Sequence, residues 1–290
     1  MRRSFTCFAS PLLTLERIGG GVSEVRLSRP SALNAFSRAS FAELLAVLER
    51  VAEDPQTRAI VLSGEGPAFS VGLDLKDHAE MLGVAPGGGD PARRGLVLRR
   101  RIAQYQRAIS ALEACPQPVV AAIHGACIGA GVDLVAAADV RVASQCAMFS
   151  IREVRLGLAA DLSTLQRLPR LVANASALNE LVFTGRDFSA AEALALGAIS
   201  GPVEADAAAV RERALALARR IAQLSPVAVA GTKANLLFAR NSSTAASLEY
   251  AAAWSGFALQ TADIAANVAA FSSRKAATPP STPPVFEDLK

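Results

Sequence analysis

The 290-residue chain has few residues of the kinds that bind metals or form disulfides, with only four cysteines and two histidines. Cys7, Cys115, Cys127 and Cys146 form neither a CxxC pair nor the Cys/His spacing of a zinc site. We therefore expect no metal site. Cys127 and Cys146 lie in apolar stretches, so we interpret them as buried thiols in a reducing compartment.

Charge and long apolar runs are also scarce. Charged residues make up 19% of the chain and the net charge is +4, without the basic stripe that a nucleic-acid partner would require. Apolar residues make up 51%, which is enough for a substantial core. No charge-free run reaches the roughly 18 residues of a membrane span, so we expect no membrane insertion. The mild basic excess suits an anionic small molecule.

Strand and helix patterns alternate in the first part of the chain. Strands are predicted at residues 22–27, 58–63, 118–123 and 140–143, and helices at 35–51 and 93–114. This alternation predicts an α/β fold. Helical patterns dominate the C-terminal third, at residues 174–183, 190–196, 205–224, 226–238 and 243–259, with one short strand pattern near 199–203.

These patterns divide the chain into four parts. Residues 1–12 form a presequence or a disordered N-terminus, 13–200 an α/β core with the site, 201–275 a helical region, and 276–290 an extended tail. Arg2 and Arg3, with no acid nearby, favour mitochondrial targeting, whereas a ragged N-terminus is the alternative. The C-terminus lacks the S-K-L peroxisomal signal. A bacterial source would instead imply a cytoplasmic protein.

Two glycine-bearing loops follow predicted strands, at residues 69–76 (FSVGLDLK) and 124–134 (HGACIGAGVDL). Glycine between a strand and a helix lets backbone N–H groups face a ligand oxygen, and one N–H from each loop can hold a developing oxyanion. Tight packing is the alternative explanation for each loop alone. Neither loop contains a dinucleotide GxGxxG or a phosphate-binding GxxxxGK[ST] motif.

The two loops resemble the F-S-x-G-x-D-L and H-G-x-x-x-G-x-G-x-[DE]-L elements of the crotonase superfamily, the enoyl-CoA hydratases and isomerases. Residues 29–35 (RPSALNA) are similar to its early R-P-x-x-x-N-A signature, and the resemblance runs from about residue 13 to 270. It implies a crotonase-like spiral of repeated strand-strand-helix units with a C-terminal helical oligomerisation region. It also implies an acyl-CoA thioester substrate, no cofactor besides the coenzyme A (CoA) of that substrate, and a homotrimer or homohexamer.

The resemblance also implies site residues. The oxyanion donors are the backbone N–H groups of Leu73 and Ala130, where Ala130 replaces the usual glycine. The substrate and CoA contacts are Gly72, Leu73, Asp74, Leu75, Lys76 and Ala130. We interpret His124 as a structural histidine and expect His78 on a helix surface. Lys76 matches a coenzyme contact, with a solvated lysine as the alternative.

Three carboxylates are the candidate acid/base groups: Asp133, Glu153 and Asp161. Each also has a structural explanation. Asp133 suits the first turn of a helix, and Asp161 suits the N-cap of a helix over residues 162–171. Arg152 and Arg155 could pair with Glu153. The resemblance implies instead that Asp133 and Glu153 are the family's catalytic carboxylates.

Asp161 stands where hydratases have a Pro-Gly-rich loop, and the stretch 153–161 is similar to the Δ3,5-Δ2,4-dienoyl-CoA isomerase branch. That reaction removes a proton at C2 and returns one at C6. These carbons lie roughly 5 Å or more apart, beyond the reach of one fixed carboxylate. The resemblance implies Asp161 as the base at C2 and Glu153 as the acid at C6, supported by Asp133.

Two other functions remain open at this point. An enoyl-CoA hydratase would add water to a 2-enoyl-CoA with Asp133 and Glu153. A non-catalytic or RNA-binding relative would share the fold alone, because one fold hosts many functions. Its marks would be a basic stripe and a lost carboxylate, and this chain keeps all three carboxylates.

Overall fold

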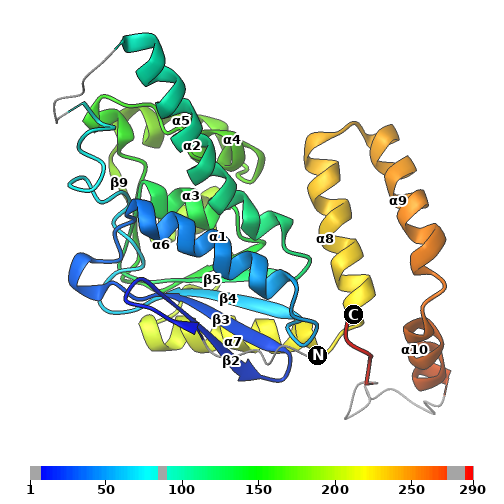
Figure 1. Cartoon of the computed structure of the whole chain (residues 1–290). Helices are drawn as coiled ribbons and strands as arrows, with labels where there is room; N and C mark the ends of the chain where they lie inside the picture. Colours follow the sequence, from blue (N-terminus) through cyan, green and yellow to red (C-terminus); the bar gives the residue numbers. More distant parts are fainter. Residues whose placement is uncertain (1–7, 84–89, 273–284, 290) are drawn as a thin grey trace.

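The computed structural model describes residues 8–83, 90–272 and 285–289. The predicted N-terminal segment and the predicted tail therefore lie largely outside the described residues. The described residues form two sheets surrounded by helices, so the predicted α/β fold is confirmed (Figure 1).

The larger sheet has the strand order β1-β2-β3-β4-β5-β7. Its strands are β1 (Phe8–Ala9), β2 (Leu13–Gly19), β3 (Val22–Leu27), β4 (Ala59–Gly64), β5 (Val119–Ile123) and β7 (Val140–Ala143). The four strands β3, β4, β5 and β7 are parallel, and the antiparallel β2 and β1 extend the β3 edge. Parallel strands bring their carboxyl ends to one edge, where the loops after β4 and β5 meet.

Side chains of the sheet alternate between two apolar layers. Ile60 and Leu62 face the main core, which α1 (Arg38–Ala52) and α2 (Pro91–Ala114) cover. Ala59 and Val61 face the other layer, which α7 (Ala207–Ala222) covers. Figure 1 shows α1 and α2 on one side of the sheet and α7 on the other. Strands buried on both faces explain the continuous apolar runs in the sequence.

The smaller sheet carries the elements of the site. It pairs β6 (Ala126–Ile128), β8 (Met148–Ser150) and β9 (Asp187–Ser189). The predicted strand-strand-helix unit occurs as β2-β3-α1 and as β5-β6-α3. The helical segments around this sheet are α3 (Ala130–Ala136), η2 (Glu153–Leu156), α4 (Thr164–Arg167), η3 (Leu168–Arg170), α5 (Ala175–Thr184) and α6 (Ala190–Leu196).

Several details differ from the sequence predictions, and β2 and the helix Ala262–Ser272 were not predicted at all. Residues 199–203 form no strand, and only a bridge between Ser144 and Glu204 lies beside them. The helix predicted over 162–171 is two short turns, α4 and η3. Cys146 is exposed, because it lies in a turn, whereas Cys127 is buried as predicted. The short strands β6, β8 and β9 were not predicted, since three residues are too few to show a periodicity.

Three C-terminal helices extend to one side of the sheet: α8 (Pro226–Asn241), α9 (Thr244–Ala258) and α10 (Ala262–Ser272) (Figure 1). The buried Lys233 ties α8 to the core. Its ammonium donates to the carbonyls of Leu112 and Gln117 at 2.8 and 2.9 Å and lies 2.8 Å from the Asp139 carboxylate. Asp139 in turn accepts a bond from the backbone N–H of Val119 in β5.

We expect Lys233→Met to lower the free energy of unfolding by about 3–5 kcal/mol, because Asp139 would lose its buried counter-charge. Urea denaturation measures the change. Lys76→Met is the matched control, since Lys76 is exposed and a surface substitution should change stability by no more than about 0.5 kcal/mol. Equal stabilities for the two variants would show that Lys233 does not hold α8 to the core.

Candidate active site

The loops after β4 and β5 are held together by their backbones. The N–H of Ser70 donates to the carbonyl of Ala126, and its carbonyl accepts from the N–H of Ile128, both at 2.9 Å. The Ser70 hydroxyl donates to the carbonyl of Asn34 at 2.8 Å, which adds the loop after β3. Three loops that are distant in the sequence therefore form one backbone cluster.

Two glycines permit this close approach. Gly72 has φ of +89°, and a Cβ there would lie 2.8 Å from the Ile128 carbonyl oxygen and 3.3 Å from the backbone nitrogen of Ala130. A Cβ on Gly131 would lie 2.9 Å from the Ser70 carbonyl oxygen. Any side chain at either position would push the loops apart. The motif glycines are therefore needed for packing, and that packing brings the Gly72–Leu73 segment next to Ala130.

The backbone N–H groups of Leu73 and Ala130 make no hydrogen bond to any of the described residues. The carbonyl of Gly72 and the N–H of Asp74 bond to Phe36, at 2.7 and 2.9 Å. Because groups alternate along an extended chain, the intervening N–H of Leu73 faces away from Phe36. Ala130 is the first residue of α3, where an N–H has no partner within the helix. The φ of Ala130 is not positive, so alanine fits where the family usually has glycine.

Glu153 lies directly beside the second loop. Its Oε1 is 3.3 Å from the position that a Cβ on Gly129 would occupy, next to Ala130. Its Oε2 is buried and has no hydrogen-bond partner among the described residues. Arg152 pairs with Asp187 at 2.7 Å, and no ion pair to Glu153 is found in the described part of the chain. The salt-bridge explanation for this carboxylate is therefore wrong.

Asp133 lies in the first turn of α3, as predicted, and is buried. Its Oδ1 accepts a hydrogen bond of 2.5 Å from the backbone N–H of Thr164. Its carbonyl accepts one of 2.7 Å from the hydroxyl of Ser163. Asp133 therefore fixes α3 to the segment that carries Asp161.

Asp161 does not cap a helix, contrary to the structural alternative. The helix α4 begins at Thr164, the side chain of its N-cap residue Ser163 makes no capping bond, and the N–H of Thr164 donates to Asp133. The backbone carbonyl of Asp161 accepts a hydrogen bond of 2.6 Å from the side-chain amide of Gln106 in α2. Asp161 as a whole is exposed. The Asp161 carboxylate therefore does not have the N-capping role that was the structural alternative.

All three carboxyl groups hold their protons more tightly than usual. Burial raises the pKa of Glu153 from 4.5 to about 7, and the charges of Asp133 and Asp161 add to the rise. Burial raises the pKa of Asp133 from 3.8 to about 6, although contacts with Thr164 and Ser163 oppose it. Partial burial also raises the pKa of Asp161. Because the charge of Asp161 acts on both Asp133 and Glu153, the three groups share one region.

The remaining predicted contacts follow the first loop. Asp74 is held by Arg29 in an ion pair of 3.0 Å, which lowers the pKa of Asp74 although burial opposes the shift. Leu75 and Lys76 are exposed, so both side chains are available to a ligand. The predicted set Gly72, Leu73, Asp74, Leu75, Lys76 and Ala130 therefore lies around the two free N–H groups.

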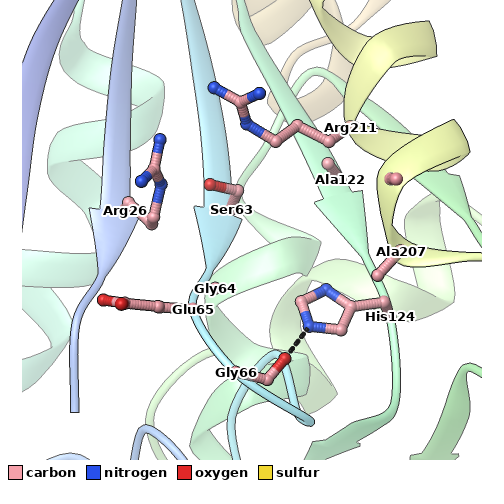
Figure 2. A pocket seen from close by; sticks show the side chains of 10 residues that line it. Arg26, Ser63, Gly64, Glu65, Gly66, Ala122, His124, Ala207 and Arg211 are labelled. Atoms are coloured by element: carbon pink, nitrogen blue, oxygen red, sulfur yellow. Dashed lines mark hydrogen bonds between the residues drawn. The ribbon is translucent and has the colours of Figure 1, made fainter. Parts of the chain in front are cut away.

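His124 lies away from the carboxylates, as expected of a structural histidine. Its Nε2 bonds to the carbonyl of Gly66 at 2.9 Å, shown as a dashed line in Figure 2. It lines a cavity of about 400 Å³ on the α7 side of the sheet. Other residues lining that cavity are Arg26, Ser63, Glu65 and Arg211, and none of the three carboxylates belongs to it.

The sequence analysis did not identify Arg29 and Gln106 as supporting residues, and it predicted the wrong environment for His78. Arg29 belongs to the R-P-x-x-x-N-A signature, so its position was a usable signal. Gln106 carried none, because it is one polar residue on a long helix. His78 is not on a helix surface but is 1% exposed, since it packs between α1 and α2.

Within the described ranges, no three His, Cys, Asp or Glu residues lie so as to hold a metal ion. The helices in the same ranges include none long and apolar enough to cross a membrane.

Comparison with known proteins identifies relatives over most of the chain. The family model described as enoyl-CoA hydratase/isomerase matches residues 17–278. The mitochondrial Δ3,5-Δ2,4-dienoyl-CoA isomerase of Mus musculus is 46% identical over 88% of this chain and 77% of its own length. The peroxisomal enzyme of the same name from Arabidopsis thaliana is 43% identical over 82% of this chain and 85% of its own.

A solved structure shares the fold. An enoyl-CoA hydratase from Bacillus anthracis has a TM-score of 0.82 and 27% sequence identity, and the match covers 95% of this chain and 98% of that one.

The raised pKa values make stability depend on pH. A carboxyl with a raised folded pKa contributes stability below its unfolded pKa and loses that contribution as the pH rises through the folded value. For Glu153 the loss falls between about 4.5 and about 7. Glutamine mimics the protonated acid, so Glu153→Gln should raise the free energy of unfolding at pH 8 but change it little at pH 4. Urea denaturation at both pH values measures this, with the exposed Glu249→Gln as control. A Glu153→Gln variant no more stable than wild type at pH 8 would contradict the shift.

Proposed function

The chain belongs to the enoyl-CoA hydratase/isomerase family, and we propose that it converts 3,5-dienoyl-CoA into 2,4-dienoyl-CoA in fatty acid β-oxidation. The relatives from Mus musculus and Arabidopsis thaliana that carry the name of this reaction are 46% and 43% identical to it over 88% and 82% of the chain. The hydratase alternative is not favoured.

The observation that supports this reaction best is a third carboxyl group, Asp161, in the same region as Glu153, Asp133 and the two free N–H groups. The charge of Asp161 contributes to the raised pKa of both Glu153 and Asp133. A hydratase needs two carboxylates and room for water. The third carboxylate suits a reaction that exchanges protons at two separate carbons.

The proton transfers follow from the different environments of these groups. Glu153, with a pKa of about 7, is protonated in a large fraction of the molecules at neutral pH, and this form can donate a proton. Asp161 is more exposed, so it is the group suited to act as the base. Asp161 takes the proton from C2, and the electron pair spreads along the conjugated chain to the thioester oxygen. Glu153 then gives a proton to C6, and the double bonds move from positions 3 and 5 to positions 2 and 4.

The backbone N–H groups of Leu73 and Ala130 hold the thioester oxygen while it carries the charge. Each such donor contributes on the order of 3–4 kcal/mol to the transition state. Asp133 accepts from Thr164 and so holds the segment of Asp161 in place. Gly72, Asp74, Leu75 and Lys76 contact the CoA thioester. The steps are proton transfers, so no cofactor besides the CoA of the substrate takes part.

We expect Asp161→Asn and Glu153→Gln each to lower kcat for 3,5-dienoyl-CoA by about 10²–10⁴-fold, because each removes a proton-transfer group. The binding of acyl-CoA should change little. Formation of the conjugated 2,4-diene is followed by its ultraviolet absorbance, and Glu249→Gln is the control. A variant with unchanged kcat would remove its residue from the mechanism.

The same assay separates the two activities. Wild-type protein is incubated with 3,5-dienoyl-CoA and, separately, with 2-enoyl-CoA. Hydration of the monoene without formation of the 2,4-diene would refute the isomerase function.

We also propose that the chain assembles as a homotrimer or homohexamer through its C-terminal helical region. Several large apolar side chains there are exposed: Leu236, Leu248, Phe257, Leu259 and Val268. No residue of α9 is buried in the single chain. A patch of this kind marks an interaction surface.

Sedimentation equilibrium should give three or six times the 30.1 kDa of one chain. The double variant Leu248→Glu/Phe257→Glu should sediment with a lower molar mass than the wild-type assembly, because two charges would lie in the proposed interface. A wild-type monomer would contradict the assembly.

A mitochondrial location is the further proposal. It is supported by the basic residues Arg2 and Arg3 and by the mitochondrial relative from Mus musculus, while the Arabidopsis thaliana relative is peroxisomal.

A further inference from the structure

A buried cluster of rings, formed by Phe41, His78 and Tyr105, lies next to the end of the first glycine-bearing loop, residues 69–76. Tyr105 of α2 stacks on Phe41 of α1, with ring centroids 4.3 Å apart. His78 meets Tyr105 edge-on at 5.4 Å and Phe41 at 6.4 Å. The exposed fractions of His78 and Tyr105 are 1% and 3%. A histidine and a tyrosine are thus buried among aromatic rings, with the Asp77 carboxylate 3.8 Å from Nδ1 of His78, and their buried polar atoms require partners.

His78 is bound to the loop through one ring nitrogen. Its Nδ1 lies 2.9 Å from the carbonyl oxygen of Asp74, and its backbone N–H donates to the same oxygen at 3.1 Å. A carbonyl oxygen only accepts, so Nδ1 carries the hydrogen. In the neutral ring, Nε2 is then an acceptor.

Two complementary atoms in this cluster have no partner among the described residues. They are Nε2 of His78, an acceptor, and the hydroxyl of Tyr105, a donor. Burial raises the pKa of Tyr105, so the hydroxyl keeps its hydrogen. Leaving a buried polar group unpaired costs about 1–3 kcal/mol, which favours pairing of these two.

We propose that Tyr105 and His78 are positioning residues that hold the oxyanion donor Leu73 in place. The Tyr105 hydroxyl donates to Nε2 of His78, directly or through one water, and Nδ1 of His78 donates to the carbonyl of Asp74. Pairing tightens when the thioester oxygen enters the hole, as catalytic hydrogen bonds commonly do. This inference rests on the proposed role of the Leu73 N–H.

The geometry explains why this contact matters for catalysis. Gly72 and Asp74 bond to Phe36 on one side of the loop, which sets the direction of the Leu73 N–H. The Asp74 carbonyl is the next anchor along the chain, one residue beyond Leu73. Arg29 holds only the Asp74 side chain. Without His78, one side-chain anchor of the main chain beyond Leu73 is lost, and the N–H can shift away from the thioester oxygen.

The test compares His78→Leu, His78→Asn and Tyr105→Phe, first singly and then His78→Leu with Tyr105→Phe. An asparagine amide can occupy the place of Nδ1 and donate to Asp74. We expect His78→Leu to lower kcat by roughly 10- to 100-fold, as displacement of a catalytic group by about 1 Å can. KM should change little. His78→Asn should recover most of the activity.

Tyr105→Phe keeps the ring and removes only the hydroxyl. It should lower kcat in the wild-type background and have no further effect in the His78→Leu background, because both act through one chain of bonds. Tyr250→Phe, the chain's other tyrosine, is the matched control.

An unchanged kcat in His78→Leu, or equal losses from Tyr105→Phe in both backgrounds, would overturn the relay. If His78→Leu does not fold, an unchanged kcat in Tyr105→Phe overturns it. These failures are distinct from failure of the proposed function, in which the wild-type protein itself would not isomerise 3,5-dienoyl-CoA.

Discussion

The two backbone hydrogen bonds of Ser70 join the loops that follow β4 and β5, and the rest of the site depends on this contact. It exists because parallel strands deliver both loops to one edge of the sheet, and because Gly72 and Gly131 leave no side chain between them. A methyl group at Gly72 or Gly131 would push the two loops apart and would therefore increase the distance between Leu73 and Ala130. Two donors can stabilise one oxygen only when their spacing is fixed before the substrate arrives.

The positions of the three carboxylates also depend on this contact between the loops. Glu153 lies over Gly129, immediately before Ala130, so its position depends on the second loop. Asp133 lies in the first turn of α3, the helix that follows this loop. Its carboxylate accepts a hydrogen bond from the N–H of Thr164, in the segment that carries Asp161. The proposed oxyanion donors and the proposed acid/base groups are therefore parts of one packed unit, and a shift of the loop would disturb both.

The sequence predicted most of the long elements and the motif residues, but neither β2 nor α10, and the reasons are physical. The apolar runs of β4 and β5, the alternation of β3 and the helical period of α1 and α2 are strong local signals. The glycine spacing indicated both loops. Strands of three residues, such as β8, carry no such signal. The burial of His78 and the contact of Gln106 with Asp161 depend on α2 lying against α1 and the 161–164 segment, which no local pattern encodes.

Burial alone does not determine whether a carboxylate is structural or chemical, as two glutamates in this chain demonstrate. Burial raises the pKa of Glu24, but hydrogen bonds from Arg211, Arg26 and Ser63 outweigh it and bring the pKa to about 2. Glu24 is therefore charged and fully paired, which suits a structural role. Glu153 is buried without a cation, and its pKa rises to about 7. A group in that state costs folding stability at neutral pH. Such a cost is typical of groups whose proton is used in a reaction, so the missing counter-charge supports the proposed role of Glu153 and not of Glu24.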